Sequence, residues 1–232
     1  TTARAPPSLT TPMSPPGGDP PPSSSLDWSR PGAFTEVFVR SERFKFNAAH
    51  FVAFKGFRER LHGHNYTVST RLIGPTSRAD GYVVDFGEIK KVVREVCAAL
   101  NERFLCPVLS DVLEISEQDD VVSIRCEDGA AFAFPAADCA MLPIVHSTAE
   151  ELGGLLWRRI IDGFGVDRLR ARRVDALEVS VAEAPMQEAR YCRRIEDYVP
   201  GIEASSSGAA SSDRETATGL PPAPPRSSET TT

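Results

Sequence analysis

The amino-acid sequence predicts an α+β fold, in which a small antiparallel β-sheet carries two α-helices on one face. Apolar and polar residues alternate through residues 62–72 and again through residues 174–181, as is typical of strands. Between these runs, residues 85–101 and 147–161 carry apolar side chains at helical spacing, which indicates two amphipathic helices. Elements in this order form two layers around one core.

The composition indicates one folded domain between two polar tails. Residues 1–33 and 201–232 are rich in Pro, Ser, Thr and other small or polar residues. Such segments bury too little apolar surface to offset the entropy lost on ordering, so we expect both tails to be disordered. Residues 34–200 remain for the domain, and this length allows one core of ordinary size.

Charge, hydropathy and cysteine usage argue against several classes of partner. The formal net charge of −6 argues against a nucleic-acid partner, because nucleic acids bind basic surfaces. No apolar run approaches the roughly 18 residues of a membrane-spanning helix, so we expect no membrane association. The cysteines are scattered and lack CxxC spacing, which is typical of reduced thiols inside the cell. We therefore expect a cytoplasmic protein, with organelle targeting by the N-terminal tail left open.

The first expected strand begins near Phe34 and changes phase midway. Val37 and Val39 alternate in one phase, whereas Phe44 and Phe46 follow in the other, which indicates a β-bulge. Residues 51–60 are expected to form a loop or short turn that returns the chain to the next strand.

Both helices begin at a predicted capping box. Asp85 can accept hydrogen bonds from the free amides of the first turn, and Glu88 can reach back. We expect this helix to end at about Asn101. Ser147 and Glu150 have the same spacing at the start of the second helix.

Residues 106–140 predict additional strands at 112–115, 121–126 and 131–134, with a turn at 127–129. We interpret this region as a β-hairpin insertion at the surface. The last core strand is expected to end at Glu183.

Three of the four histidines, His50, His62 and His64, fall within residues 50–64. On a strand, residues i and i+2 project to the same side, so His62 and His64 point together, and His50 could pair across from them. Three imidazoles without a nearby thiolate suit a zinc ion with an open fourth position, which is typical of catalytic zinc. The alternative is a hairpin with solvated histidines.

The motifs FNAAH (46–50), LHGHNY (61–66) and GYVVDF (81–86) occur in this order. Together they resemble the 6-pyruvoyl-tetrahydropterin synthase family, which includes the 6-carboxy-tetrahydropterin synthases, and the resemblance covers about residues 34–191. It implies that His50, His62 and His64 bind Zn²⁺ and that residues 34–200 form a pterin synthase-like domain. It also implies the tunnelling fold, in which subunits join their sheets into a barrel, so we expect a homotrimer or homohexamer.

The resemblance implies two substrate-binding residues. Glu183 ends the pattern VSVAE, which in the family supplies the carboxylate that anchors the pterin. A carboxylate can accept the adjacent N–H groups of a pterin together. Thr148 lies where the family contacts the pterin edge. The alternatives are a solvated Glu183 and a Thr148 that only begins a helix.

The chain departs from the family at the proton-transfer residues. The usual cysteine before the HGH motif is absent, since no cysteine precedes Cys97, and residues 100–103 lack the usual Asp–His pair. A variant group, known from malaria parasites, has a glutamate just before LHGHNY instead, and Glu59 resembles that form. We expect Glu59 to be the catalytic residue, with a solvated loop charge as the alternative.

The function that the resemblance implies is a zinc-dependent lyase acting on 7,8-dihydroneopterin triphosphate. The standard reaction eliminates triphosphate and leads to the pyruvoyl product of tetrahydrobiopterin biosynthesis. In the glutamate variants the side chain is cleaved instead to 6-hydroxymethyl-dihydropterin, a folate precursor. A non-catalytic oligomer that binds pterin or zinc is the third alternative.

Overall fold

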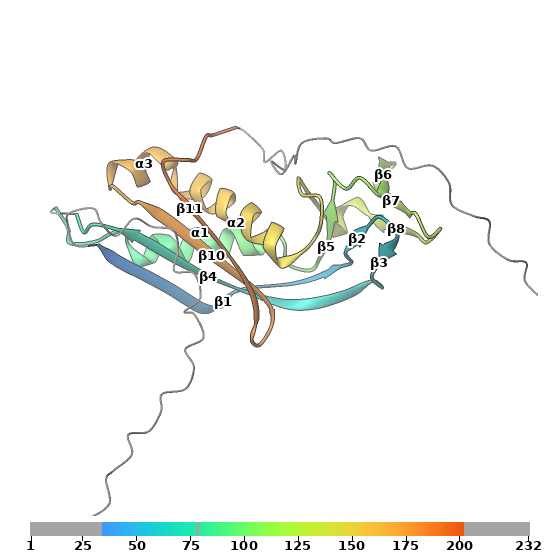
Figure 1. Ribbon diagram of the computed structural model, residues 1–232, viewed down its shortest axis with the longest axis horizontal. Helices are drawn as coiled ribbons and strands as arrows, with labels where there is room; N and C mark the ends of the chain where they lie inside the picture. The colour runs from blue at the N-terminus through green and yellow to red at the C-terminus, as the bar shows by residue number, and fades with distance from the viewer. Residues whose placement is uncertain (1–33, 78, 202–232) are drawn as a thin grey trace, which may run out of the picture.

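The computed structural model describes residues 34–77 and 79–201. The predicted tails, apart from Gly201, lie outside the described residues, so their disorder stays a prediction. Six strands form one mixed sheet in the order β11-β10-β4-β1-β5-β9 (Figure 1). These strands are β1 (Thr35–His50), β4 (His62–Gly74), β5 (Arg103–Pro107), β9 (Cys139–Leu142), β10 (Ala176–Ala184) and β11 (Gln187–Arg194).

Two long helices cover one face of this sheet, as predicted (Figure 1). They are α1 (Phe86–Ala98) and α2 (Ala149–Phe164), and a short helix that the sequence patterns did not predict, α3 (Val166–Ala171), follows. The main core lies between helices and sheet. It is anchored by Trp157, which is fully buried and whose Nε1–H donates to the Leu177 carbonyl of β10 at 2.8 Å. No helix within 34–77 and 79–201 has the length and apolar character needed to cross a bilayer.

The long strand β1 pairs antiparallel with β4 and contains the predicted bulge. The register is interrupted between Arg40 and Lys45, and it resumes with Lys45 opposite Thr67 and Phe46 opposite Tyr66. The interruption restores the inward direction of Phe44 and Phe46, both fully buried, after the exposed segment that precedes them.

The N-cap of α1 is confirmed, although Glu88 pairs with Arg168 rather than reaching back, and the cap of α2 differs from the prediction. Asp85 accepts from the amides of Gly87 and Glu88 at 2.7 and 3.1 Å, although α1 ends at Ala98, not Asn101. The N-cap of α2 is Thr148, not Ser147, because Thr148 Oγ1 accepts from the Glu151 amide at 3.3 Å.

The prediction of a purely antiparallel sheet is wrong at one edge, and at the other edge the sheet has one antiparallel strand more than expected. β5 runs parallel to β1 and to β9, and a hairpin joins β10 to β11, so the last strand does not end the sheet at Glu183. Four of the five residues of β5 are buried, so the strand has no polar alternation that could reveal it.

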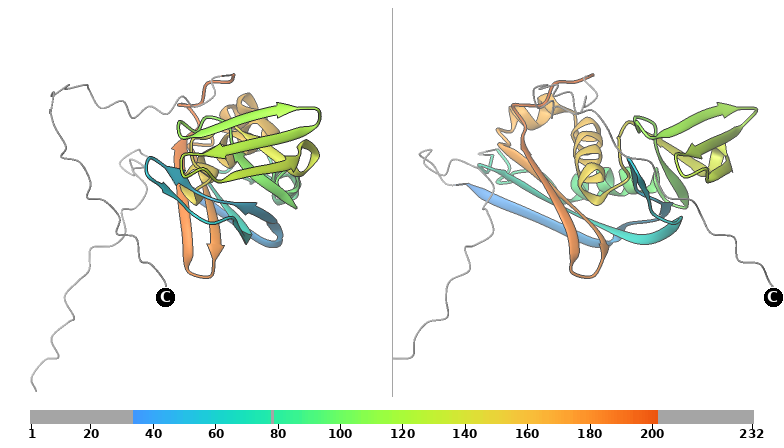
Figure 2. Two further views of the ribbon diagram at one scale, coloured as in Figure 1. Left: turned by 90° about the vertical axis from the view of Figure 1, so that its right-hand side faces the viewer. Right: turned by 45° about the vertical axis from the view of Figure 1, so that its right-hand side comes forward.

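The predicted insertion is a three-stranded antiparallel sheet rather than a hairpin. Its strands are β6 (Leu113–Gln118), β7 (Val121–Cys126) and β8 (Ala131–Pro135), followed by a 3₁₀ turn (Ala136–Asp138). Figure 2 shows this sheet at one end of the molecule, beside the short hairpin of β2 (Ala53–Phe54) and β3 (Phe57–Arg58). A second, smaller core lies there, and Phe51 and Phe104 contribute to it.

Candidate metal and substrate site

The pairing of β1 with β4 brings the three predicted histidines together. His50 lies opposite His62, and Ala48 lies opposite His64. One ring nitrogen from each of the three imidazoles lies within 4.8 Å of the other two. Such a spacing allows a single ion to contact all three.

Hydrogen bonds fix the orientation of two of these rings. Nδ1–H of His50 donates to the Ser147 carbonyl at 2.9 Å, and Nδ1–H of His62 donates to the Arg60 carbonyl at 2.7 Å. Each ring therefore offers Nε2 as its ligand atom. Backbone carbonyls on the opposite nitrogen are the usual support of metal-binding histidines.

The nitrogen His50 Nε2 is buried and has no hydrogen-bond partner among the described residues. A buried polar atom without a partner costs free energy unless something binds it. Burial lowers the pKa of His50 to about 4, which keeps the imidazole neutral, as a metal ligand must be. The residues present therefore fit a metal ion.

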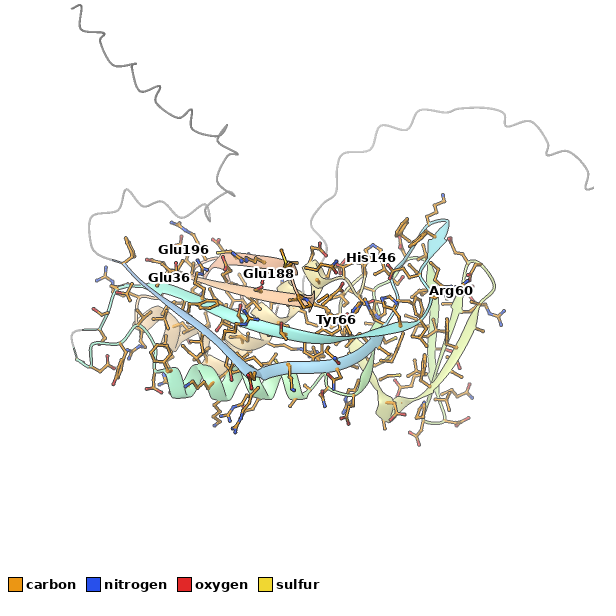
Figure 3. The ribbon with its side chains drawn as sticks, turned by 90° about the horizontal axis from the view of Figure 1, so that it is seen from below. Glu36, Arg60, Tyr66, His146, Glu188 and Glu196 are labelled. Atoms are coloured by element: carbon orange, nitrogen blue, oxygen red, sulfur yellow. The ribbon has the colours of Figure 1, made fainter. Side chains whose placement is uncertain are left out.

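A cavity of about 380 Å³ opens beside His50 and His62. Three further predicted site residues, Glu59, Thr148 and Glu183, also line it, whereas His64 does not. Figure 3 views the sheet from the side opposite the helices and labels Arg60, which precedes β4, and Tyr66 further along that strand. Strands, loop and helix start thus contribute to one site.

Glu59 is held by a reciprocal contact with Val52. Its amide donates to the Val52 carbonyl at 2.9 Å, and the Val52 amide donates to its Oε2 at 3.0 Å. The other carboxylate oxygen, Oε1, accepts no hydrogen bond within the described ranges. The carboxylate is therefore oriented, with one oxygen left to interact with a ligand.

Glu183 lies on β10, beside the histidines. Its Oε2 is 3.9 Å from His64 Nε2, and its side chain is 25% exposed. Tyr66, which is fully buried, faces the same carboxylate, and its pKa is raised above its ordinary value first by burial and then by the charge of Glu183. The structure thus places Glu183 in the site rather than on an open surface.

Known proteins resemble this chain along most of the described residues. The family model of 6-pyruvoyl tetrahydropterin synthase matches residues 40–194. The chain belongs to the 6-pyruvoyl tetrahydropterin synthase family. A relative from Methanocaldococcus jannaschii, a putative 6-carboxy-5,6,7,8-tetrahydropterin synthase, is 29% identical over 152 residues, which cover 66% of this chain and 91% of that one.

Solved structures of the family are also similar. The 6-pyruvoyl tetrahydropterin synthase of Plasmodium vivax is 46% identical with a TM-score of 0.68, covering 70% of this chain and 99% of that chain. The synthase of Plasmodium falciparum is 42% identical, with the same TM-score and coverage. Two further structures are Plasmodium vivax catalytic-residue variants in which a glutamate is replaced by alanine or cysteine, each 45% identical.

Ser147 and His146, two consecutive residues that bond to groups near this site, were not assigned to it from the sequence. Ser147 is fully buried, and its hydroxyl donates to the Phe51 carbonyl at 3.0 Å while its own carbonyl holds His50. His146 bonds through Nδ1 to the Ala53 carbonyl at 3.0 Å and is not part of the histidine group. No sequence signal connects Ser147 with His50, because 97 positions separate them.

Proposed function

We propose that this member of the synthase family is a zinc-dependent enzyme that acts on 7,8-dihydroneopterin triphosphate. The observation that carries the proposal is a single cavity lined by a candidate base, Glu59, by two of the metal-binding histidines and by a candidate pterin anchor, Glu183. In the standard reaction of the family, triphosphate is eliminated from this substrate.

The metal would be held by Nε2 of His50 and His62 together with His64. Three imidazoles and an open position are the ligand set of catalytic zinc. Zinc bound there would supply Lewis acidity, lowering the pKa of hydroxyl groups on the substrate side chain.

The pterin ring would be held by Glu183 and Thr148. A carboxylate can accept two adjacent N–H groups of the ring at once, which fixes the orientation of the ring as well as its position. The Thr148 Oγ1 atom accepts the Glu151 amide and keeps its own O–H free to donate toward the cavity that it lines.

Glu59 would accept a proton from the substrate side chain and return it. The hydrogen bond from the Val52 amide to Oε2 orients the carboxylate, and Oε1 would take the proton. A positioned base of this kind contributes about 100- to 10,000-fold to a reaction rate. The proposal gains support from the Plasmodium vivax structures in which a catalytic glutamate was replaced.

A second candidate reaction is cleavage of the side chain of the same substrate to 6-hydroxymethyl-dihydropterin. The observation that favours it is the presence of a carboxylate, not a thiolate, at the base position. All described cysteines lie elsewhere: Cys97, Cys106, Cys126 and Cys139 are buried, and Cys192 is on β11.

We also propose that the protein assembles into a homotrimer or homohexamer that closes its sheets into a barrel. Within the described residues, β9 and β11 are edge strands without a further partner. Open edges pair readily with other strands unless something covers them, and a barrel removes them.

The product decides between the two reactions. Purified protein would be incubated with 7,8-dihydroneopterin triphosphate, and the pterin product would be identified by mass, with a chelator-treated sample as control. A pyruvoyl product supports elimination, and a hydroxymethyl product supports cleavage. Unchanged substrate with metal-loaded protein would contradict both and indicate a non-catalytic pterin- or zinc-binding protein.

A further inference from the structure

The loop that carries Glu59 is tied to the β6–β7–β8 sheet by one side chain. Arg58 donates from Nε to Asp128 Oδ2 at 2.8 Å, and its Nη2 lies 2.8 Å from the same oxygen. Through Nη1 it donates to the carbonyl of Glu59 at 2.8 Å. A single guanidinium therefore joins the backbone at Glu59 to the turn between β7 and β8.

A second contact ties the tip of the β2–β3 hairpin to the same turn. The amide of Gly56 donates to Glu127 Oε2 at 3.0 Å. Gly56 has a φ of +79°, a conformation that glycine adopts without strain. Glu127 and Asp128, two consecutive residues of the turn, thus hold two points of the loop.

Packing makes the Arg58 contact more than a surface ion pair. The guanidinium lies over the rings of Phe51 and Phe132, 5.9 and 5.6 Å from their centroids, and the two rings stack at 5.1 Å. The Arg58 side chain is only 18% exposed. A partly buried, stacked arginine is less screened by solvent than an exposed one, so its geometry is better defined.

The turn itself is internally braced. Asp128 Oδ1 accepts from the Ala130 amide at 3.0 Å, and the Cys126 amide donates to the Ala130 carbonyl at 2.9 Å. The hydrogen bond from Arg58, followed by that from the Ala130 amide, holds the pKa of Asp128 below its usual value. Asp128 therefore offers a charged oxygen at a fixed position.

We propose that the Cys126–Ala130 turn positions Glu59 for proton transfer, acting through Arg58. The inference rests on the proposed catalytic role of Glu59. Arg58, Glu127 and Asp128 do not line the cavity, so they act as positioning residues. A base misplaced by a fraction of an ångström loses much of its rate advantage, and a loop of short strands needs outside support. The three-stranded sheet would supply that support.

The first test is Asp128→Asn. Asparagine keeps the size of the side chain and an oxygen for the Ala130 amide, but it removes the charge opposite Arg58. We expect kcat to fall about tenfold while zinc content and melting temperature stay near those of the wild type. KM should change by less than about twofold, because the turn does not touch substrate.

The matched control is Glu114→Gln. This substitution breaks the exposed ion pair between Glu114 and Arg125 in the same three-stranded sheet. Neither side chain of that pair bonds to the Glu59 loop, so kcat should not change. Arg58→Lys provides a second variant, because an ammonium cannot bond Asp128 and the Glu59 carbonyl with the fork geometry of a guanidinium. It should reproduce the loss in kcat.

A double-mutant cycle separates positioning from general structural damage. In a Glu59→Gln background, Asp128→Asn should have no further effect, since the group that it positions can no longer act as a base. Equal losses in both backgrounds, or an unchanged kcat in the single variant, would overturn the inference. A wild-type rate for Glu59→Gln alone would instead show that the proposed base is wrong, and the inference would fall with it.

Discussion

Glu59 and Val52 exchange two hydrogen bonds, one between backbone groups at 2.9 Å and one from the Val52 amide to the Glu59 carboxylate at 3.0 Å. The loop between β1 and β4 thus closes on itself at its base. This closure directs the carboxylate before any substrate arrives.

The closure makes Glu59→Gln a sharp test of the proposed base. Glutamine can still accept from the Val52 amide, so fold and zinc content should persist, but it cannot take a proton. We expect turnover to drop by at least about 100-fold in a steady-state assay. Glu59→Cys should shift the product toward the pyruvoyl compound, as detected by mass. Wild-type turnover of Glu59→Gln would leave Glu59 as a solvated loop charge.

Zinc content should depend on the three grouped histidines and not on the fourth. We expect about one zinc per chain, and its loss in His62→Ala or His64→Ala, because two imidazoles bind zinc much more weakly than three. His146→Ala is the matched control, since His146 bonds to the Ala53 carbonyl and lies outside the group. Elemental analysis of protein purified without chelator checks this prediction. If the wild-type protein contains no metal, the proposed zinc-dependent reaction is wrong.

Light scattering should show a trimer or a hexamer at micromolar concentration. The reason is the pair of edge strands, β9 and β11, which the described part of the chain leaves without partners. The β11 edge lies beside the candidate site, since Gln187, Glu188 and Ala189 line its cavity. A monomer mass that persists with substrate present would contradict the barrel.

Acid should weaken the segment before α1. Arg172 pairs with Asp80 at 3.0 Å and donates to the carbonyls of Tyr82 and Val83, and the Arg172 hydrogen bond lowers the pKa of Asp80 from 3.8 to about 2. Because the folded pKa lies below the unfolded one, this contribution to stability is complete above pH 3.8 and is lost as the pH falls through about 2.

The corresponding measurement is the melting temperature of wild type and Asp80→Asn between pH 2 and pH 7. The variant should melt lower near neutral pH, and the difference should shrink toward pH 2. A difference that does not depend on pH would show that the ion pair does not stabilise the fold.

The sequence predicted the elements whose residues carry periodicity and missed those without it. The bulge in β1 was visible because Phe44 and Phe46 change phase, and Asp85 was visible as a cap. In contrast, β5 is buried on both sides and has no alternation. Most residues of β11 are polar, and they do not alternate with apolar ones. Tyr191 packs against the core, but its neighbours in the sequence show no strand pattern that would have predicted this.

The site divides in the same way. His50, His62 and His64 were found because their spacing brings them together on paired strands and because the motifs around them resemble those of the family. The residues that support the site could not be predicted from the sequence. Ser147 bonds to His50, and Asp128 bonds to Arg58, only because tertiary packing brings them together. Their residue types are ordinary in turns and at helix starts.

Because His50 pairs with His62, a change in the length of the loop between them would affect the three histidines and the proposed base, Glu59, differently. The histidines are fixed by the register of two long strands, so residues inserted into or deleted from the intervening loop would leave them facing each other. Glu59 belongs to that loop and would move with every such change. The candidate metal group would therefore persist while the proposed base beside it is exchanged, which offers a structural route by which one scaffold can carry different proton-transfer residues.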